Sequence, residues 1–281
     1  MKDYLNYKDK ICVVTGAASG IGRCLCEELI HLGAEIYGLD IIDPQMKGIH
    51  YIKVNLEFQK SIDEAFELIP DKIDKLFLVA GISADKRFSF ETVFHVNFTA
   101  NQYILDYYAL KKMNSNGAIA IISSMAGVYW KEYIYEYQNI ADMNGWDAVN
   151  VELEKLNKKH MVDGASYILS KRAIIYHAMK KIKVFGEHNI RINVLLPGST
   201  LTAMTEKMIA DGLKEELLKT DGVAGRLADV QEMVKPLLFL NSEMATFLTG
   251  DILLGDFGFY MMDYVGIQSN DHYYDFSVFK K

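Results

Sequence analysis

The stretch that decides the fold is Ile11-Cys12-Val13-Val14-Thr15-Gly16-Ala17-Ala18-Ser19-Gly20-Ile21-Gly22. Its first four residues form an apolar run that predicts a buried β-strand. The glycines that follow have the spacing G-x-x-x-G-x-G, which permits a tight turn into a helix and lets the backbone approach a pyrophosphate. An ordinary loop can also hold three glycines, but this one lies between a strand and a helix, the context that a dinucleotide site requires. We therefore predict that the cofactor phosphates bind at Gly16, Ser19, Gly20, Ile21 and Gly22.

The same alternation of apolar strands and amphipathic helices continues along the chain. Further strands are predicted at 36–40, 51–54, 76–80, 119–122, 191–195 and 251–254, and helices at 21–32, 61–69 and 100–112. Alternating strands and helices indicate βαβ units, and hence a parallel sheet covered on both faces. No Gly/Ser linker or repeat divides the chain. We predict one α/β domain over residues 1–281, a doubly wound Rossmann fold with a seven-stranded parallel sheet.

Composition and charge limit the possible binding partners and the cellular compartment of the protein. The formal net charge of −7 disfavours nucleic acid and anionic membranes, both of which need a basic surface. The three cysteines, Cys12, Cys24 and Cys26, suggest neither a disulfide framework nor a metal site, because two of them point in different directions on a predicted helix. No apolar run approaches the roughly 20 residues of a membrane span. With a polar beginning and no signal peptide expected, a cytoplasmic protein is predicted.

Asp40 closes the second predicted strand, 18 residues beyond Gly22. A carboxylate there accepts hydrogen bonds from the adenosine ribose hydroxyls and repels a 2′-phosphate. No Arg or Lys occupies positions 17–19 or 41–43 to bind that phosphate. The sequence therefore favours NAD over NADP, the alternative being that Asp40 is only an exposed carboxylate at a strand end.

Tyr167-Ile168-Leu169-Ser170-Lys171 places a phenol and an ammonium four residues apart, on one face of a helix. Ketone reduction needs an acid that protonates the developing alkoxide, and alcohol oxidation needs the corresponding base. A neighbouring ammonium stabilises the phenolate and brings the pKa of tyrosine, about 10 when unperturbed, towards the working pH. Tyr-x-x-x-Lys by itself is common, because the chain has 17 tyrosines.

Several short motifs occur in a fixed order with these two sites. They are the turn 15–22, Asp40, Val79-Ala80-Gly81, His95-Val96-Asn97, Ile122-Ser123-Ser124, Tyr167 with Lys171, and Pro197-Gly198-Ser199-Thr200-Leu201-Thr202. In this set, over about residues 8–258, the chain resembles the classical short-chain dehydrogenase/reductase family. The resemblance implies an oxidoreductase that uses a nicotinamide cofactor. A non-catalytic NAD-sensing protein is the alternative of another class.

The resemblance implies a catalytic role for four residues. Tyr167 would be the general acid/base and Lys171 its partner, which also holds the nicotinamide ribose. Ser124 would hydrogen-bond the substrate carbonyl oxygen, since the family's active serine usually takes the second place of the Ser123-Ser124 pair. Asn97 would hold the water that passes protons from Lys171 to solvent.

The resemblance also implies further cofactor contacts. Asn55 stands where the family usually has Asp, and would meet the adenine amino group with Leu56 beneath the ring. Ala80 and Gly81 belong to a motif that departs from the family's Asn-Asn-Ala-Gly, so the sheet-stabilising bonds of the two asparagines are absent. The remaining contacts would be Pro197, Gly198, Thr200 and Thr202, although the two threonines are also typical turn formers.

A long insert separates Ser124 from Tyr167, which stand 43 positions apart, whereas most classical members have far fewer residues there. The insert, at about 129–163, contains an amphipathic helix in which Trp146, Val149 and Leu153 share a face. With the short segment after Gly81 and with Asp40, it is similar to the bacterial 3α-hydroxysteroid dehydrogenase/carbonyl reductase subgroup. That similarity implies oxidation of the 3-hydroxyl of a steroid or bile acid.

The residues after Ser124 are rich in aromatic side chains, which suit a small apolar alcohol or ketone such as a steroid. They serve equally well to dock the insert on the body of the protein, and a polyol, sugar or acyl-chain ketone is the alternative substrate. The tail at about 260–281 is also aromatic and is expected to close the pocket or an interface. The family is mostly dimeric or tetrameric, so a homodimer or homotetramer is expected.

Overall fold

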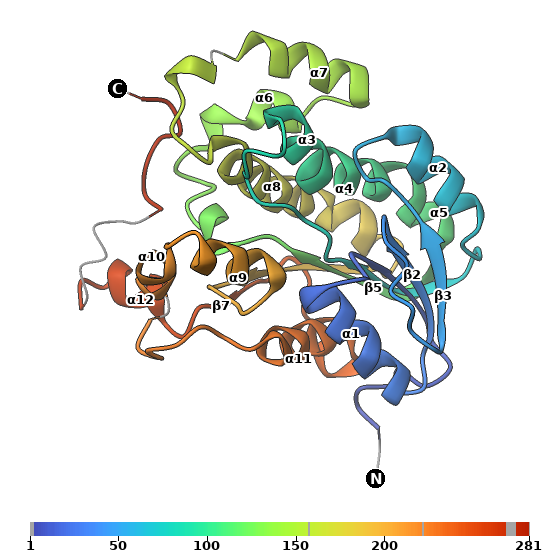
Figure 1. The fold of residues 1–281 in the computed structure, drawn as a ribbon. Coiled ribbons are helices and arrows are strands. Elements are labelled where there is room, and N and C mark those ends of the chain that lie inside the picture. The colour runs from blue at the N-terminus through green and yellow to red at the C-terminus, as the bar shows by residue number, and fades with distance from the viewer. Residues whose placement is uncertain (1–2, 157, 221, 268–273, 281) are drawn as a thin grey trace.

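Seven parallel strands form one sheet through the centre of the computed structural model (Figure 1), which describes residues 3–156, 158–220, 222–267 and 274–280. The strands are β1 (Ile11–Thr15), β2 (Glu35–Asp40), β3 (Ile49–Lys53), β4 (Ile73–Leu78), β5 (Met113–Ile122), β6 (Arg191–Pro197) and β7 (Ile252–Gly255). Their order in the sheet is β3-β2-β1-β4-β5-β6-β7, and every pair is parallel. The predicted seven-stranded Rossmann fold is confirmed.

Helices cover both faces of the sheet, because strands that are apolar on both sides need a layer on each. One face carries α1 (Gly20–His31) and α11 (Val230–Asn241), which pack on each other over one hydrophobic core. The larger core on the other face contains α2 (Gln59–Glu67) and α8 (Ala165–Gly186). The remaining α-helices are α3 (Phe90–Phe94), α4 (Ala100–Tyr103), α5 (Leu110–Lys112), α6 (Gln138–Ala141), α7 (Trp146–Lys155), α9 (Ala203–Ala210), α10 (Lys214–Leu218) and α12 (Phe259–Tyr264).

One helical run from Phe90 to Lys112 contains two π-helical turns, η1 (His95–Thr99) and η2 (Ile104–Ala109), between α3, α4 and α5. Such turns insert a residue into the α-helical ladder and are frequent at functional sites. The first of them contains Asn97. Short 3₁₀ turns lie at η3 (Met125–Gly127), η4 (Ile134–Glu136), η5 (Lys158–His160) and η6 (Glu243–Ala245).

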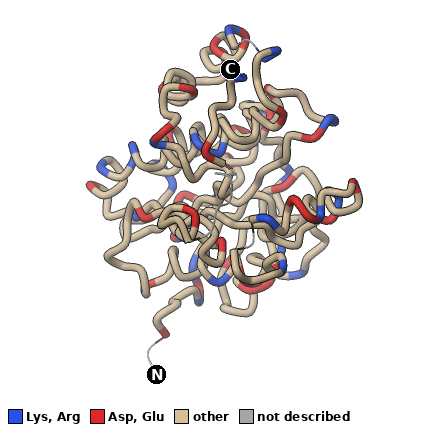
Figure 2. Tube along the Cα trace, turned by 90° about the vertical axis from the view of Figure 1, so that its left-hand side faces the viewer, with Lys and Arg blue, Asp and Glu red and all other residues tan. Residues whose placement is uncertain are grey.

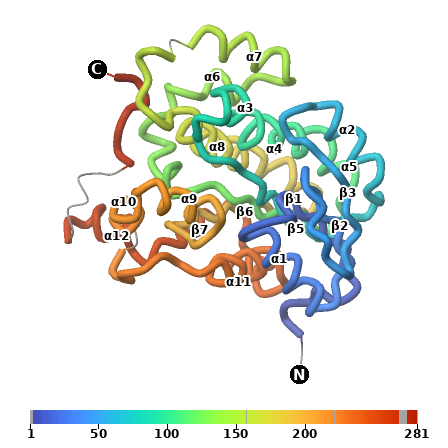
Figure 3. The backbone as a smooth tube through the Cα atoms, viewed as in Figure 1, coloured from blue at the N-terminus to red at the C-terminus, as the bar shows by residue number. Residues whose placement is uncertain are grey.

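The insert lies on the α8 side of the molecule, with α6 and α7 above α8 in Figure 1. Val149 and Leu153 are fully buried on the inner face of α7, as its periodicity predicts. The C-terminal segment, red in Figure 3, runs alongside the insert, where Phe279 pairs with Met161 in an antiparallel bridge. The tail therefore packs against the insert, which sequence periodicity alone did not indicate.

Acidic and basic residues are interspersed along the trace (Figure 2). The expected absence of a nucleic-acid partner stays a prediction. Among the described residues, no helix combines the length and the apolar character needed to cross a membrane.

Candidate active site

The strand order reverses direction between β1 and β4, and the two segments that follow these strands meet there. In open α/β sheets, ligands bind outside the carboxyl ends of the strands at this switch point. The glycine turn follows β1, and Ala80 with Gly81 follows β4. Thr15 joins the two, because its Oγ1 accepts the amides of Val79 at 3.0 Å and Ala80 at 3.1 Å. Thr15, which the sequence analysis did not single out as a site residue, thus ties the segment after β4 to the start of the glycine turn.

The glycine turn forms a cradle that fits a dinucleotide phosphate. Gly16 has a φ of +77°, and a Cβ there would lie 2.9 Å from Ala80 Cα. A Cβ on Gly22 would overlap the carbonyl oxygen of Gly16, so these two sites require glycine. Ser19 is the N-cap of α1, yet its side chain makes no capping bond, and the first turn of α1 contains no acidic residue. The first-turn amides, beginning at Gly20 and Ile21, are therefore arranged to receive an anion.

The carboxylate of Asp40 is fixed at the end of β2. Its two oxygens accept the amides of Ala18 at 2.9 Å and Ile42 at 3.1 Å, which leaves further lone pairs for ribose hydroxyls. One basic residue that the sequence analysis did not identify lies close to this end of β2. Arg23 on α1 donates from Nη1 to the Pro44 carbonyl at 2.9 Å, just beyond Asp40 along the chain.

Asn55 and Leu56 follow β3, on the side predicted for adenine. Asn55 Oδ1 accepts the amide of Glu57 at 3.0 Å, which forms a local turn and leaves one lone pair for an adenine amino group. Leu56 is buried and belongs to the core of that face. The adenine contact stays a prediction for both residues.

Residues 197–202, which begin with the last residue of β6, reach the glycine turn. A Cβ on Gly20 would lie 3.3 Å from Thr202 Cγ2. Thr202 also caps α9, and Thr200 Oγ1 donates to the Gly198 carbonyl at 3.0 Å. Both threonine hydroxyls thus serve the local backbone, as turn formers do, and their contact with a nicotinamide carboxamide stays a prediction.

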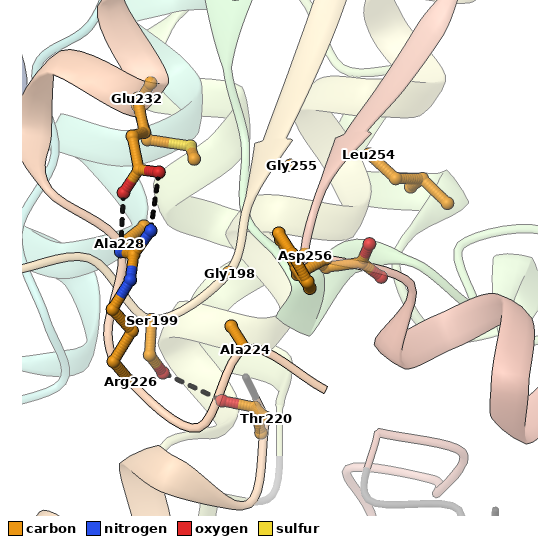
Figure 4. Close-up of a pocket in the computed structure, with 12 residues that line it drawn as sticks. Gly198, Ser199, Thr220, Ala224, Arg226, Ala228, Glu232, Leu254, Gly255 and Asp256 are labelled. Carbon is orange, nitrogen blue, oxygen red and sulfur yellow. Dashed lines mark hydrogen bonds and ion pairs between the residues drawn. The ribbon is translucent and has the colours of Figure 1, made fainter. Parts of the chain in front are cut away.

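A cavity of about 230 Å³ borders this segment (Figure 4). Its wall combines residues after β6, the end of β7 with the residues that follow, and the region before and at the start of α11. These residues are Gly198, Ser199, Thr220, Ala224, Arg226, Ala228, Glu232, Met233, Leu254, Gly255, Asp256 and Phe257. The close-up shows Arg226 joined to Glu232 by two bonds, and Ser199 to Thr220 by one. These polar groups pair with each other, and no predicted catalytic residue lines the cavity.

The predicted acid/base, Tyr167, lies in the first turn of α8, and Ser124 lies just after β5. Burial raises the pKa of the Tyr167 phenol, and a hydrogen bond with the Ser124 side chain acts in the opposite direction. Ser124 Oγ also accepts the Ala126 amide at 3.2 Å, which fixes its position at the start of η3. The neighbouring Ser123 is buried and donates to the Lys171 carbonyl at 2.7 Å. Of the two serines, Ser124 is therefore the one directed at Tyr167.

Lys171 is buried beside Tyr167, with its Nζ 5.4 Å from the centre of the phenol ring. Burial lowers the pKa of this ammonium to about 8. Gly81 lies against it, since a Cβ at that position would stand 3.2 Å from both Lys171 Nζ and Asn97 Oδ1. The four predicted catalytic residues are thus brought to one place with Gly81 between two of them.

Asn97 is buried, and its side chain is engaged by the backbone that follows Gly81. Oδ1 accepts the Ile82 amide at 2.8 Å and Nδ2 donates to the Ile82 carbonyl at 2.9 Å. The Asn97 carbonyl accepts a bond from Asn101 Nδ2 at 2.9 Å, a contact between residues four apart that the sequence reading missed. A water on Asn97 stays a prediction.

The family models agree with this geometry. The short chain dehydrogenase model matches residues 10–138, and the model described as enoyl-(acyl carrier protein) reductase matches residues 149–260. The chain belongs to the short-chain dehydrogenase/reductase family. It is therefore an oxidoreductase of a family that uses a nicotinamide cofactor.

Relatives within the family act on different molecules. The chain is 26% identical over 264 residues to 3-oxoacyl-(acyl-carrier-protein) reductase FabG of Aquifex aeolicus, covering 89% of this chain and 96% of the relative. It is also 26% identical over 258 residues to 3-alpha-hydroxysteroid dehydrogenase/carbonyl reductase of Comamonas testosteroni, covering 88% and 95%. The fold is similar to the 3-alpha-hydroxysteroid dehydrogenase of Pseudomonas sp. B-0831 complexed with NADH, with a TM-score of 0.76, 23% identity and coverage of 92% and 100%.

The site's own groups suit proton transfer in this short-chain dehydrogenase. A buried phenol with a raised pKa stays protonated near neutral pH, and so can donate to the oxygen of a ketone. In the reverse direction the Lys171 ammonium favours the phenolate that accepts the proton of an alcohol. Ser124 can hold the same substrate oxygen. The nicotinamide cofactor, when bound, takes up or delivers the hydride.

Proposed function

We propose that the protein interconverts a secondary alcohol and a ketone with NAD, with Tyr167 as acid/base, Lys171 as its partner, Ser124 as the substrate ligand and Asn97 as the water site. The observation that carries the proposal is the meeting of the phenol, the serine hydroxyl and the buried ammonium beside the glycine cradle. A protein that only senses NAD needs no acid/base next to its cofactor, so this grouping argues for catalysis.

NAD is favoured over NADP because of the charge at the end of β2. Asp40 is held by two backbone amides, so it cannot easily turn away from a 2′-phosphate. Arg23 is the nearby residue that could bind such a phosphate, but Glu27 lies 3.2 Å from its Nε and Pro44 accepts from its Nη1. The carboxylate is therefore expected to dominate the choice.

Asp40→Ala is expected to narrow the preference for NAD, measured as kcat/KM with each cofactor, by about 10²-fold, since one charged hydrogen bond and one repulsion are lost. If Arg23 binds the 2′-phosphate in the Asp40→Ala variant, adding Arg23→Ala to that variant should increase its preference for NAD again. The matched control is Asp43→Ala in the exposed turn that follows. A wild-type protein that uses NADP better than NAD would contradict the proposed role of Asp40 in cofactor choice.

For the substrate we propose a steroid or bile acid oxidised at a 3-hydroxyl, with a polyol, sugar or acyl-chain ketone as the alternative. Two rings support an apolar ring system near the site. Tyr129, five residues after Ser124, meets Tyr260 of α12 edge to face with centroids 5.5 Å apart. Tyr129 is also tied to α12 by its hydroxyl, which donates to Asp263 at 3.0 Å. Tyr133 instead bonds Asp275 of the C-terminal segment, and Tyr137 bonds the Trp130 carbonyl within the insert.

The wild type should oxidise androsterone with a micromolar KM, and Tyr260→Ala should raise that KM about tenfold, since a buried aromatic contact contributes a few kcal/mol at most. Turnover of cyclohexanone, which is too small to span both rings, should change little. Met261→Ala, an exposed residue on the same helix, is the matched control. Equal losses on both substrates, or faster oxidation of a polyol such as sorbitol by the wild type, would reject the steroid proposal.

The proposed setting is the cytoplasm, as a homodimer or homotetramer formed from copies of this single domain, with no nucleic-acid or membrane partner. Three free, buried thiols support a reducing compartment. Large apolar side chains exposed near the edge strand β7, such as Phe247, Phe257 and Tyr264, support association between copies.

A further inference from the structure

The residue after the catalytic lysine, Arg172, forms an ion pair that is entirely removed from solvent. Its Nη1 lies 3.0 Å from Oε2 of Glu136, and both side chains have 0% exposure. Glu136 ends the 3₁₀ turn η4 in the insert. A buried pair is costly unless most of the remaining polar atoms of both groups are also bonded, because each charge has lost its water.

The C-terminal segment, residues 274–280, supplies most of those bonds, although Arg172 Nε is buried without a hydrogen-bond partner. Arg172 Nη2 donates to the carbonyls of Tyr274 at 3.1 Å and Phe276 at 3.0 Å. Glu136 Oε1 accepts the amide of Val278 at 3.1 Å, and Val278 is fully buried. Both charged groups therefore depend on the backbone of this segment. If it left, the guanidinium and the carboxylate would each keep only the other as a hydrogen-bonded partner, away from solvent.

Further contacts close the segment against the insert. The Val278 carbonyl accepts the amide of Val162 at 2.9 Å, beside the bridge between Met161 and Phe279. The ring of Tyr133 lies 4.3 Å from the Arg172 guanidinium, and its hydroxyl donates to Asp275 at 2.8 Å. The segment is thus docked by a sheet-like ladder, by a buried side chain and by the ion pair.

The same ion pair fixes the segment that begins with the catalytic serine. Residues 124–136 are anchored to α8 at both ends, to two consecutive residues. At the first end Ser123 Oγ donates to the Lys171 carbonyl, and at the last Glu136 pairs with Arg172. The Ser124 hydroxyl that meets Tyr167 therefore belongs to a loop whose far end is held on α8 by Glu136. The next two residues, Tyr137 and Gln138, contact Tyr176 of the same helix.

We propose that Arg172 is a positioning residue, which with Glu136 joins segment 124–136 and the C-terminal segment to the catalytic helix. Substrate is then bound productively only while the C-terminal segment is docked. The inference rests on the proposed role of Ser124. The glycine turn and Asp40 lie outside these contacts, so we expect cofactor binding to be independent of the Arg172–Glu136 pair.

Two variants test it. In one the chain stops before Tyr274, and in the other Arg172→Met and Glu136→Gln remove both charges together, so that no charge is left unpaired. We expect NADH to bind as in the wild type, by fluorescence titration, while kcat/KM for androsterone falls on the order of 10²-fold. Arg172→Lys keeps the ion pair but loses the two hydrogen bonds to the carbonyls of Tyr274 and Phe276. Its kcat/KM should lie between those of the wild type and the double variant. A peptide of residues 274–281 added to the truncated protein should restore activity.

A readout without substrate separates this inference from the proposed function. Hydrogen exchange of residues 125–137 should become at least about tenfold faster in both variants, whereas α1 should exchange as in the wild type. Glu187→Gln, at the other end of α8, is the matched control and should change neither readout. A wild type inactive on every alcohol would reject the proposed function only. Unchanged exchange of 125–137, unchanged kcat/KM in an active protein, or equal loss of NADH binding would overturn the positioning role.

Discussion

Tyr167→Phe is expected to lower kcat by about 10³-fold while NADH binding stays within a factor of two or so, since general acid/base catalysis contributes on that order and the ring itself is kept. Only the hydroxyl that meets Ser124 is removed. Binding of NADH by fluorescence and kcat at saturating cofactor, on the alcohol that the wild type oxidises best, measure the two effects separately. Because burial raises the pKa of this phenol, the remaining activity should lose the rise with pH that oxidation shows in the wild type.

Tyr176→Phe, on the same helix, is the matched control, because its hydroxyl lies 3.2 Å from the Asp142 carboxylate and away from the cluster. It should retain wild-type kcat. Retention of more than about a tenth of the activity by Tyr167→Phe would remove this residue from the acid/base role, as would a parallel loss of NADH binding.

The parts of the fold that sequence could predict are those governed by local rules. The glycine turn after β1 forms because a positive φ at Gly16 and the contact at Gly22 exclude side chains, and both requirements are visible as glycines. Strand β4 was predicted to continue to Ala80 but ends at Leu78. The amides of Val79 and Ala80 are instead taken by Thr15, a partner 64 and 65 residues away that no local pattern reveals.

Long-range pairings explain what the sequence could not predict in the site. The helical periodicity of α7 was readable, whereas the partner of Arg172 lies 36 residues before it and its carbonyl acceptors 102 and 104 residues after it. For the same reason, the aromatic residues after Ser124 allowed two equally supported interpretations of their role. Their composition suits either a pocket or a docking surface, and only contacts such as Tyr133 with Asp275 separate the two for individual rings.

Lys171→Met is expected to abolish most activity and to stabilise the protein at neutral pH. The pKa of this ammonium is about 8 in the folded chain, against 10.5 for an ordinary lysine. Below pH 8 both the folded and the unfolded chain carry the proton, so the folded state bears the full cost of burying the charge. Between pH 8 and 10.5 the unfolded chain binds more protons, so the free energy of unfolding rises with pH in that window. The cost at pH 7 is on the order of 3 kcal/mol.

Methionine has nearly the same length without the charge, so Lys171→Met should raise the melting temperature at pH 7 by several degrees. The gain should shrink towards zero near pH 10, while kcat falls about 10²-fold at every pH. Urea unfolding at pH 7 and pH 10 measures the first effect, and Lys183→Met, exposed on the same helix, is the control that should show neither. A variant that is equally stabilised at both pH values, or destabilised at pH 7, would contradict the claim that the buried ammonium beside Tyr167 lowers the stability of the folded protein.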